Sequence, residues 1–203
     1  MKIIAATLLA ALFPAAAGGA DIPLRPVATY SIVARDSITG QMGVAVQSHW
    51  FSVGSIVPWA EAGVGAVATQ SFVQPSYGPL GLELMNMGRT AGEALKALVS
   101  TDPGEAVRQV AMVDAAGNVA AHTGSKAVTA AGHHVGAQYS TQANLMDRPT
   151  VWEAMARAYE ESEGDLADKL IAALEAAERE GGDIRGRQSA AILVVSGKNT
   201  GRP

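Results

Sequence analysis

The sequence predicts an α+β domain in which two sheets pack face to face and helices cover both outer faces. The order of the predicted elements carries this prediction: several strands, two helices, a hairpin and a strand, two more helices, and a last strand. The chain has 203 residues and is 48% hydrophobic, which is enough for one domain with a substantial core. Its 22 glycines and many alanines indicate elements that pack closely through small residues.

A β-hairpin is predicted at residues 29–47. Tyr30, Ile32 and Ala34 alternate with their neighbours in the period of two that is typical of a strand. The segment DSITG at 36–40 supplies the turn, and Gly40 is free to adopt a positive φ there. The hairpin therefore begins at a threonine, Thr29, and returns through residues 42–47.

Strand and helix patterns continue along the rest of the chain. Thr90 and Glu93 have the spacing of a capping box, so a helix should start after Thr90. Asp165 is expected to cap a later helix. The elements predicted after the hairpin are β-structure within 51–74, most clearly at 64–72, a helix at 80–87, a helix between Thr90 and Asp102, strands at 108–114, 118–122 and 139–146, helices at 150–161 and 165–179, and a strand at 189–196.

Composition excludes several classes of function. The net charge of −4 gives no basic excess for nucleic acid. No cysteine is present, which excludes disulfides, thiolate zinc sites and a cysteine nucleophile. The four histidines lack metal-binding spacing, and His133 and His134 should point apart in a strand. GxSxG and GxxxxGK[ST] motifs are also absent, so neither a serine elbow nor a phosphate loop is indicated, and we expect no metal and no cofactor.

The N-terminus has the features of an export signal. Lys2 precedes an apolar run at 3–13 that is too short to cross a bilayer. Gly18 and Ala20 fit the positions before a cleavage site, so we expect a periplasmic or secreted protein that leaves the membrane on cleavage. A retained hydrophobic anchor is the alternative. The predicted organisation is a signal peptide at 1–20, a proline-containing linker at 21–28, a single domain at 29–196 and a tail at 197–203.

Thr29 is the candidate nucleophile. A threonine hydroxyl needs a base to take its proton, and the residue's own α-amine can serve if Thr29 is the first residue of the chain. Such an amine titrates near ~7.7–8.0, so a useful neutral fraction exists at neutral pH. The alternative is that Thr29 only begins a strand.

Six segments of the sequence resemble a known family. They are TYSIVARD, GVAVQSHWFSVG, GVGAVATQS, YGPLGLELM, VAAHTG and GGDIRGRQSA. They are similar to a family catalogued as a domain of unknown function, which is assigned to the N-terminal-nucleophile (Ntn) hydrolase superfamily alongside proteasome subunits and acylases. The resemblance spans residues 29–195. It implies a four-layer αββα sandwich with two mainly antiparallel sheets, hydrolysis of an amide bond in a small amide or peptide-like compound, and a tendency to form homo-oligomers.

The resemblance places the family's threonine on Thr29, with two departures. Many members of the family begin with Met-Thr, whereas Val27 and Ala28 precede Thr29 here. Signal cleavage before Asp21 would leave residues 21–28 in front, so a further cut after Ala28 is required. Proteasome-like enzymes also place a lysine near the nucleophile, but no lysine lies between Lys2 and Lys96.

Polar residues at strand ends and in one loop are the candidates for binding substrate or stabilising an oxyanion. Asn144 offers an amide donor suited to an oxyanion. An arginine in the 183–188 loop could hold a carboxylate by two parallel hydrogen bonds, or pair internally with Asp183. The candidates are Ser48, His49, Gln70, Ser71, Asn144, Asp183, Arg185 and Arg187.

Two functions follow from these observations. The first is an exported Ntn amidohydrolase that uses Thr29. The second is a non-catalytic ligand-binding or scaffold protein that keeps the fold. The intact motifs favour the enzyme, whereas the missing lysine and the blocked threonine favour the binding protein.

Overall fold

The computed structural model describes residues 28–199, which contain nine strands and four α-helices. The predicted signal peptide, the linker up to residue 27 and residues 200–203 of the predicted tail lie outside the described residues. The elements are β1 (Thr29–Arg35), β2 (Met42–Ser48), β3 (Pro58–Glu61), β4 (Gly65–Ser71), α1 (Tyr77–Asn86), α2 (Ala91–Thr101), β5 (Arg108–Asp114), β6 (Val119–Thr123), β7 (Gly132–Gly136), β8 (Tyr139–Asn144), α3 (Val151–Glu161), α4 (Leu166–Arg179) and β9 (Ser189–Val195), with short 3₁₀ turns at Val53–Ser55 and Glu105–Val107.

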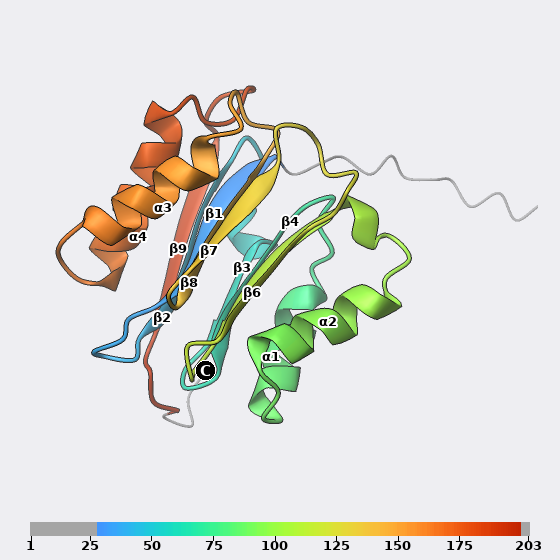
Figure 1. The fold of residues 1–203 in the computed structure, drawn as a ribbon, viewed down its shortest axis with the longest axis vertical. Coiled ribbons are helices and arrows are strands. Elements are labelled where there is room, and N and C mark those ends of the chain that lie inside the picture. Colours follow the sequence, from blue (N-terminus) through green and yellow to red (C-terminus); the bar gives the residue numbers. More distant parts are fainter. Residues whose placement is uncertain (1–27, 200–203) are drawn as a thin grey trace, which may run out of the picture.

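The strands form two antiparallel sheets that face each other (Figure 1). One sheet has the order β7-β8-β1-β2-β9 and the other the order β3-β4-β5-β6. Helices α3 and α4 cover the outer face of the first sheet, and α1 and α2 cover the outer face of the second. Three buried apolar clusters fill the three interfaces between these layers. The predicted α+β architecture with two antiparallel sheets and two helix pairs is confirmed.

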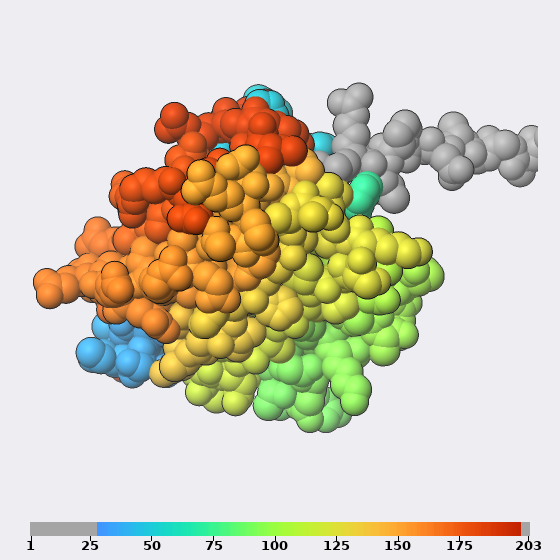
Figure 2. Space-filling view, turned by 45° about the horizontal axis from the view of Figure 1, so that its top comes forward, coloured from blue at the N-terminus to red at the C-terminus, as the bar shows by residue number. Residues whose placement is uncertain are grey.

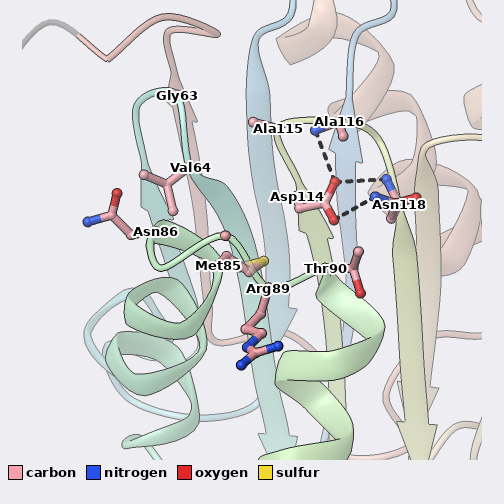
Figure 3. A pocket seen from close by; sticks show the side chains of 11 residues that line it. Gly63, Val64, Met85, Asn86, Arg89, Thr90, Asp114, Ala115, Ala116 and Asn118 are labelled. Atoms are coloured by element: carbon pink, nitrogen blue, oxygen red, sulfur yellow. Dashed lines mark hydrogen bonds between the residues drawn. The ribbon is translucent and has the colours of Figure 1, made fainter.

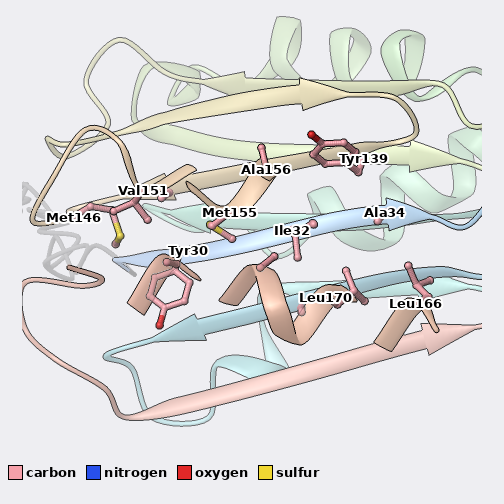
Figure 4. Packing of buried hydrophobic residues seen from close by; sticks show 14 residues of the cluster. Tyr30, Ile32, Ala34, Tyr139, Met146, Val151, Met155, Ala156, Leu166 and Leu170 are labelled. Atoms are coloured by element: carbon pink, nitrogen blue, oxygen red, sulfur yellow. The ribbon is translucent and has the colours of Figure 1, made fainter. Parts of the chain in front are cut away.

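Strand β1 lies at the centre of the five-stranded sheet, between β2 and β8. Tyr30, Ile32 and Ala34 project toward the helices, where Met155 of α3 and Leu170 of α4 pack in the same cluster (Figure 4). The alternate residues of β1 therefore face the second sheet. This is the period-two pattern that the sequence predicts for the strand.

Local signals in the sequence placed several boundaries correctly. Asp36 accepts hydrogen bonds from the backbone of residues 38 and 39 in the first turn, and Gly40 has a φ of 73°. Capping boxes begin α2 at Thr90 and α4 at Asp165. These turns and caps hold the ends of β1, β2 and the helices at fixed positions around the sandwich.

Strand β7 is an element that the sequence analysis did not identify. Its sequence, GHHVG, has little apolar alternation, and the strand forms by pairing with β8. The two histidines point apart, as expected for neighbours in a strand. His133 contacts Thr123 of β6, whereas His134 pairs with Glu153 of α3.

Candidate active site at the start of strand β1

Thr29 is fully buried at the first position of β1, opposite Ser48 of β2 and Asn144 of β8. Its hydroxyl Oγ1 donates a hydrogen bond to Ser48 Oγ at 3.2 Å. Ser48 Oγ in turn donates to the carbonyl oxygen of Ala28 at 2.5 Å. The threonine hydroxyl and the peptide bond that precedes it are thus joined through one serine.

The carbonyl of Ala28 also accepts a hydrogen bond from Arg185. Arg185 Nη2 lies 3.1 Å from this oxygen and 2.9 Å from Asp183 Oδ2, while Arg185 Nε lies 3.1 Å from Asp183 Oδ1. The Asp183 side chain is 1% exposed and also accepts from the backbone N–H of His49 at 3.2 Å. The predicted internal ion pair between Arg185 and Asp183 is present, and it holds Arg185 against the Ala28–Thr29 peptide. Binding of a substrate by this arginine stays a prediction.

Two side-chain amides reach the carbonyl of Thr29, one from each sheet. Gln70 Nε2 of β4 lies 3.3 Å from the Thr29 carbonyl oxygen, and Asn144 Nδ2 lies 3.5 Å from it. Both amides also donate to Gln109 Oε1 of β5, at 2.7 Å and 3.0 Å. Gln109 thus joins the two sheets at the point where β1 begins.

More buried polar groups continue this network along β1. Ser31 Oγ donates to Gln70 Oε1 at 2.6 Å, and Gln142 Nε2 donates to Ser31 Oγ at 2.6 Å. Ser140 Oγ completes the row by donating to Gln142 Oε1 at 3.0 Å. All of these side chains are fully buried. Buried polar groups are costly unless they are paired, and paired groups hold one another in fixed positions. Most members of this network are paired, whereas Asn144 Oδ1 is buried without a partner among residues 28–199. The surroundings of Thr29 are therefore pre-organised.

Comparison with known proteins identifies the family of this chain. A model of a family of unknown function, DUF1028, matches residues 29–203. The chain belongs to the DUF1028 family. A crystal structure of protein SPO2555 from Silicibacter pomeroyi, which carries the same family label, is 32% identical, with a TM-score of 0.77 over 83% of this chain and 74% of that one. No curated protein matches this DUF1028 chain.

The DUF1028 fold gathers five of the eight predicted assisting residues around the Ala28–Thr29 peptide: Ser48, Gln70, Asn144, Asp183 and Arg185. An isolated β-bridge joins Met146, just after β8, to Asp183. Figure 2 turns this end of the molecule forward.

The other three predicted residues of the DUF1028 chain have different positions. Arg187 is 76% exposed and pairs with Glu178 at 3.2 Å, away from Thr29. His49 reaches the site through its backbone N–H, and its Nδ1 is buried without a hydrogen-bond partner in the described part of the chain. Ser71 has a φ of 69°, and its buried hydroxyl also has no such partner among residues 28–199.

Gln109, Gln142 and Ser31 belong to the site but were not identified from the sequence. The available signal was polarity at an inward-facing position of a strand that is otherwise apolar. Gln109 is a polar residue within the buried part of β5, and Ser31 is one within the buried part of β1. A polar residue in such a position usually has a specific partner when it is buried.

A second pocket lies near the opposite end of β4 and has a volume of about 250 Å³ (Figure 3). It contains Asp114, whose carboxylate accepts from the backbone N–H groups of Ala91, Ala116 and Asn118 and from the Asn118 amide. These bonds fix the β5–β6 turn and the start of α2, so the carboxylate has a structural role.

Across residues 28–199, no group of three or more histidine or carboxylate side chains is placed to hold a metal ion. Within the same range, no helix has the length and apolarity needed to span a membrane.

Proposed function

We propose that this chain is an Ntn-type hydrolase that cleaves an amide bond in a small amide or peptide-like compound, with Thr29 as the nucleophile. One observation supports the proposal above all. The hydroxyl of Thr29 and the two carbonyls beside it are held by side chains from β2, β4, β8 and the 183–188 loop. The layered αββα arrangement is consistent with an Ntn-type sandwich.

The chain that begins before Thr29 is a precursor under this proposal. The amine of Thr29 is part of its peptide bond with Ala28 and cannot accept a proton there. We therefore propose export with removal of residues 1–20, followed by a cut after Ala28. The family match begins at Thr29 itself, which agrees with a mature protein that starts at this residue.

The position of the Ala28 carbonyl suggests where the substrate carbonyl binds. In the precursor this oxygen accepts from Ser48 Oγ and Arg185 Nη2. After the cut, both donors become available to the oxygen of a substrate amide. An oxygen that gains negative charge during attack is stabilised by pre-organised donors of this kind.

The proposed reaction then has two steps. The Thr29 amine takes the proton of Oγ1, which attacks the substrate carbonyl carbon, and the leaving amine departs with that proton. Water hydrolyses the resulting threonine ester to release a carboxylic acid and restore the hydroxyl. In the precursor, attack of Thr29 Oγ1 on the Ala28 carbonyl carbon would break the bond from that carbon to the Thr29 nitrogen, which takes up the hydroxyl proton as it leaves. Water would then hydrolyse the ester, which releases the preceding segment as a carboxylic acid and leaves the amine free. This step has no free α-amine as its base and therefore differs from the later reaction.

The test compares two forms of the protein, one that begins at Asp21 and one that begins at Thr29, with both first residues verified by intact mass. Each form is screened against a library of small amides. We expect hydrolysis by the Thr29 form and by any Asp21 form that has cut itself, and none by Thr29→Ala. Activity in an intact Asp21 form would contradict the proposal, and inactivity of a verified Thr29 form would favour the non-catalytic binding protein.

A further inference from the structure

A pocket of about 540 Å³ lies between the 123–133 segment and the first turn of α3. This volume falls within the roughly 300–1,000 Å³ that is typical of small-molecule sites. The side chains that define it are Thr123, Ser125, Thr129, His133 and Trp152. None of the lining residues has a permanently charged side chain, so the walls offer hydroxyls, one imidazole and one aromatic ring.

The imidazole of His133 is held in one orientation by the buried network. Its Nδ1 lies 2.8 Å from Thr123 Oγ1, which accepts from Gln109 Nε2 at 2.9 Å. The Thr123 hydroxyl can donate its proton to Nδ1, and we assign the tautomer on that basis, with the N–H of the neutral ring on Nε2. Burial lowers the pKa of His133, which favours this neutral form. The hydrogen bond of the His133 ring within residues 28–199 is made by Nδ1, and the ring lines the pocket, so Nε2 remains available to a ligand.

Trp152 forms a flat apolar wall whose position is also fixed. A Cβ atom added to Gly132 would lie 2.4 Å from the Trp152 ring, so the ring packs directly on the backbone of β7. Thr141 Oγ1 donates to the Trp152 carbonyl at 2.8 Å and anchors the first turn of α3 to β8. Ring and imidazole are therefore presented together by rigid elements, which is the usual basis of a specific site.

We propose that this pocket binds a small neutral molecule that has a flat ring packed on Trp152 and a hydrogen-bond acceptor facing His133 Nε2. None of the residues that line this pocket contacts Thr29 in the bonds described above, and β7 lies two strands from β1, about 10 Å away. Gln109 bonds both Thr123 of the pocket and the amides at the Thr29 carbonyl. An ionic ligand would lose part of its hydration on contact with Trp152 without gaining an opposite charge from the lining residues, and is therefore disfavoured. The proposal does not depend on the chemistry of Thr29.

Three probes of similar shape test the site on the protein that begins at Asp21: benzamide, benzoate and benzamidine. Binding is followed by NMR through the Trp152 indole N–H and the His133 ring. We expect benzamide to produce saturable shifts at both residues, with the two ionic probes roughly tenfold or more weaker because their charge is not compensated. Absence of benzamide shifts, or equal binding of an ionic probe, would overturn the proposal.

Two variants test the role of the pocket itself. His133→Phe keeps a ring but removes the donor, and Ala127→Leu fills the pocket while leaving His133 in place. Each should weaken benzamide binding roughly tenfold or more. Ala116→Leu, in the pocket beside Asp114, is the matched control and should leave binding unchanged. If His133→Phe does not fold, Ala127→Leu still decides the matter, and full binding by folded Ala127→Leu would contradict the proposal.

Discussion

The space between the two sheets has an apolar half and a polar half, although the same strands line both. Val33 of β1 faces the second sheet within an apolar cluster, whereas Ser31, two residues earlier, belongs to the amide network. The same change occurs between Ala68 and Gln70 on β4. On β5 it occurs between Ala111 and Gln109. In each strand the polar residue is the one nearer to the Thr29 end.

The difference shows that stability alone does not explain the polar half. Apolar side chains of similar size would fill the space without the cost of burying amides, which is large unless every group is paired. Polar networks instead fix geometry, because each donor must meet its acceptor at a set distance. The polar half therefore fixes the geometry around Thr29, and the apolar half contributes hydrophobic burial between the sheets.

Substitution of Gln109 should have the largest effect on stability. Gln109→Met keeps the volume but leaves donors on Gln70 and Asn144 and two backbone carbonyls without their partner. We expect a loss of about 3–5 kcal/mol in the free energy of unfolding, measured with urea. Val113→Ala in the apolar half, the control, should lose about 2 kcal/mol. A smaller loss for Gln109→Met than for Val113→Ala would contradict the comparison.

Substitution of Arg185 should affect both stability and function. Arg185→Ala leaves Asp183 with the backbone donors of residues 49 and 185, so we expect a loss of about 1–3 kcal/mol in urea unfolding. If Arg185 stabilises an oxyanion, the rate of amide hydrolysis by the Thr29 form should also fall roughly 10²–10³-fold. A stability loss with an unchanged rate would limit Arg185 to the ion pair.

Acid should destabilise the protein in part through His133, which is joined to Gln109 of the polar half through Thr123. Because burial lowers the pKa of His133, the unfolded chain binds a proton at this residue before the folded chain does. Its contribution to stability is therefore present above about pH 6.5, the usual histidine value, and is lost as pH falls below it. The free energy of unfolding should fall between pH 7 and pH 5, and it should fall less in His133→Gln than in the unmodified protein. The difference is the free energy linked to the proton that His133 binds more readily in the unfolded chain.

Two other histidines, His122 and His134, serve as the control for the acid measurement. His122 and His134 pair with Glu105 and Glu153, and all four residues remain in His133→Gln. The difference between the two pH profiles therefore isolates His133. Identical profiles would show that His133 is not held neutral in the folded protein.

The smallest effect is expected at Arg187, which lies in the same loop as Arg185. The Arg187 side chain is 76% exposed where it pairs with Glu178. Exposed ion pairs contribute about 0–1 kcal/mol to the free energy of unfolding. Arg187→Ala should therefore change urea unfolding by less than about 1 kcal/mol and leave hydrolysis unchanged. An effect as large as that of Arg185→Ala would show that the loop acts as a whole.

The parts of the fold that the sequence predicted are those encoded locally. The β1–β2 hairpin and the helices that begin after Thr90 and Asp165 follow from alternation, turn residues and capping boxes within a few positions. Strand β7 was missed because its own sequence has little apolar alternation and it forms by pairing with β8. The recognisable strand pattern of this pair lies in β8. A strand without its own periodicity cannot be recognised before its partner is placed.

The site was predictable only in part for the same reason. Thr29, Ser48 and Asn144 lie at strand ends that register brings together, and strand ends can be read from the sequence. Gln109 joins the network through contacts with another sheet, which no local pattern specifies. Arg185 and Arg187 are two residues apart in a loop, and only the fold separates the arginine that faces Ala28 from the one that faces solvent.

The central claim is that Thr29 is a nucleophile when it is the first residue. The most direct measurement is mass spectrometry of the protein after treatment with an electrophilic β-lactone, for the form that begins at Thr29 and for an uncut form that begins at Asp21. We expect one acyl adduct on the Thr29 residue of the first form, none on the second, and none on Thr29→Ala. Thr29→Ala should remain folded, because removing this hydroxyl should lower the free energy of unfolding by only about 0.5–1.5 kcal/mol. An unlabelled Thr29 form with its first residue verified, or equal labelling of the uncut form, would contradict the account.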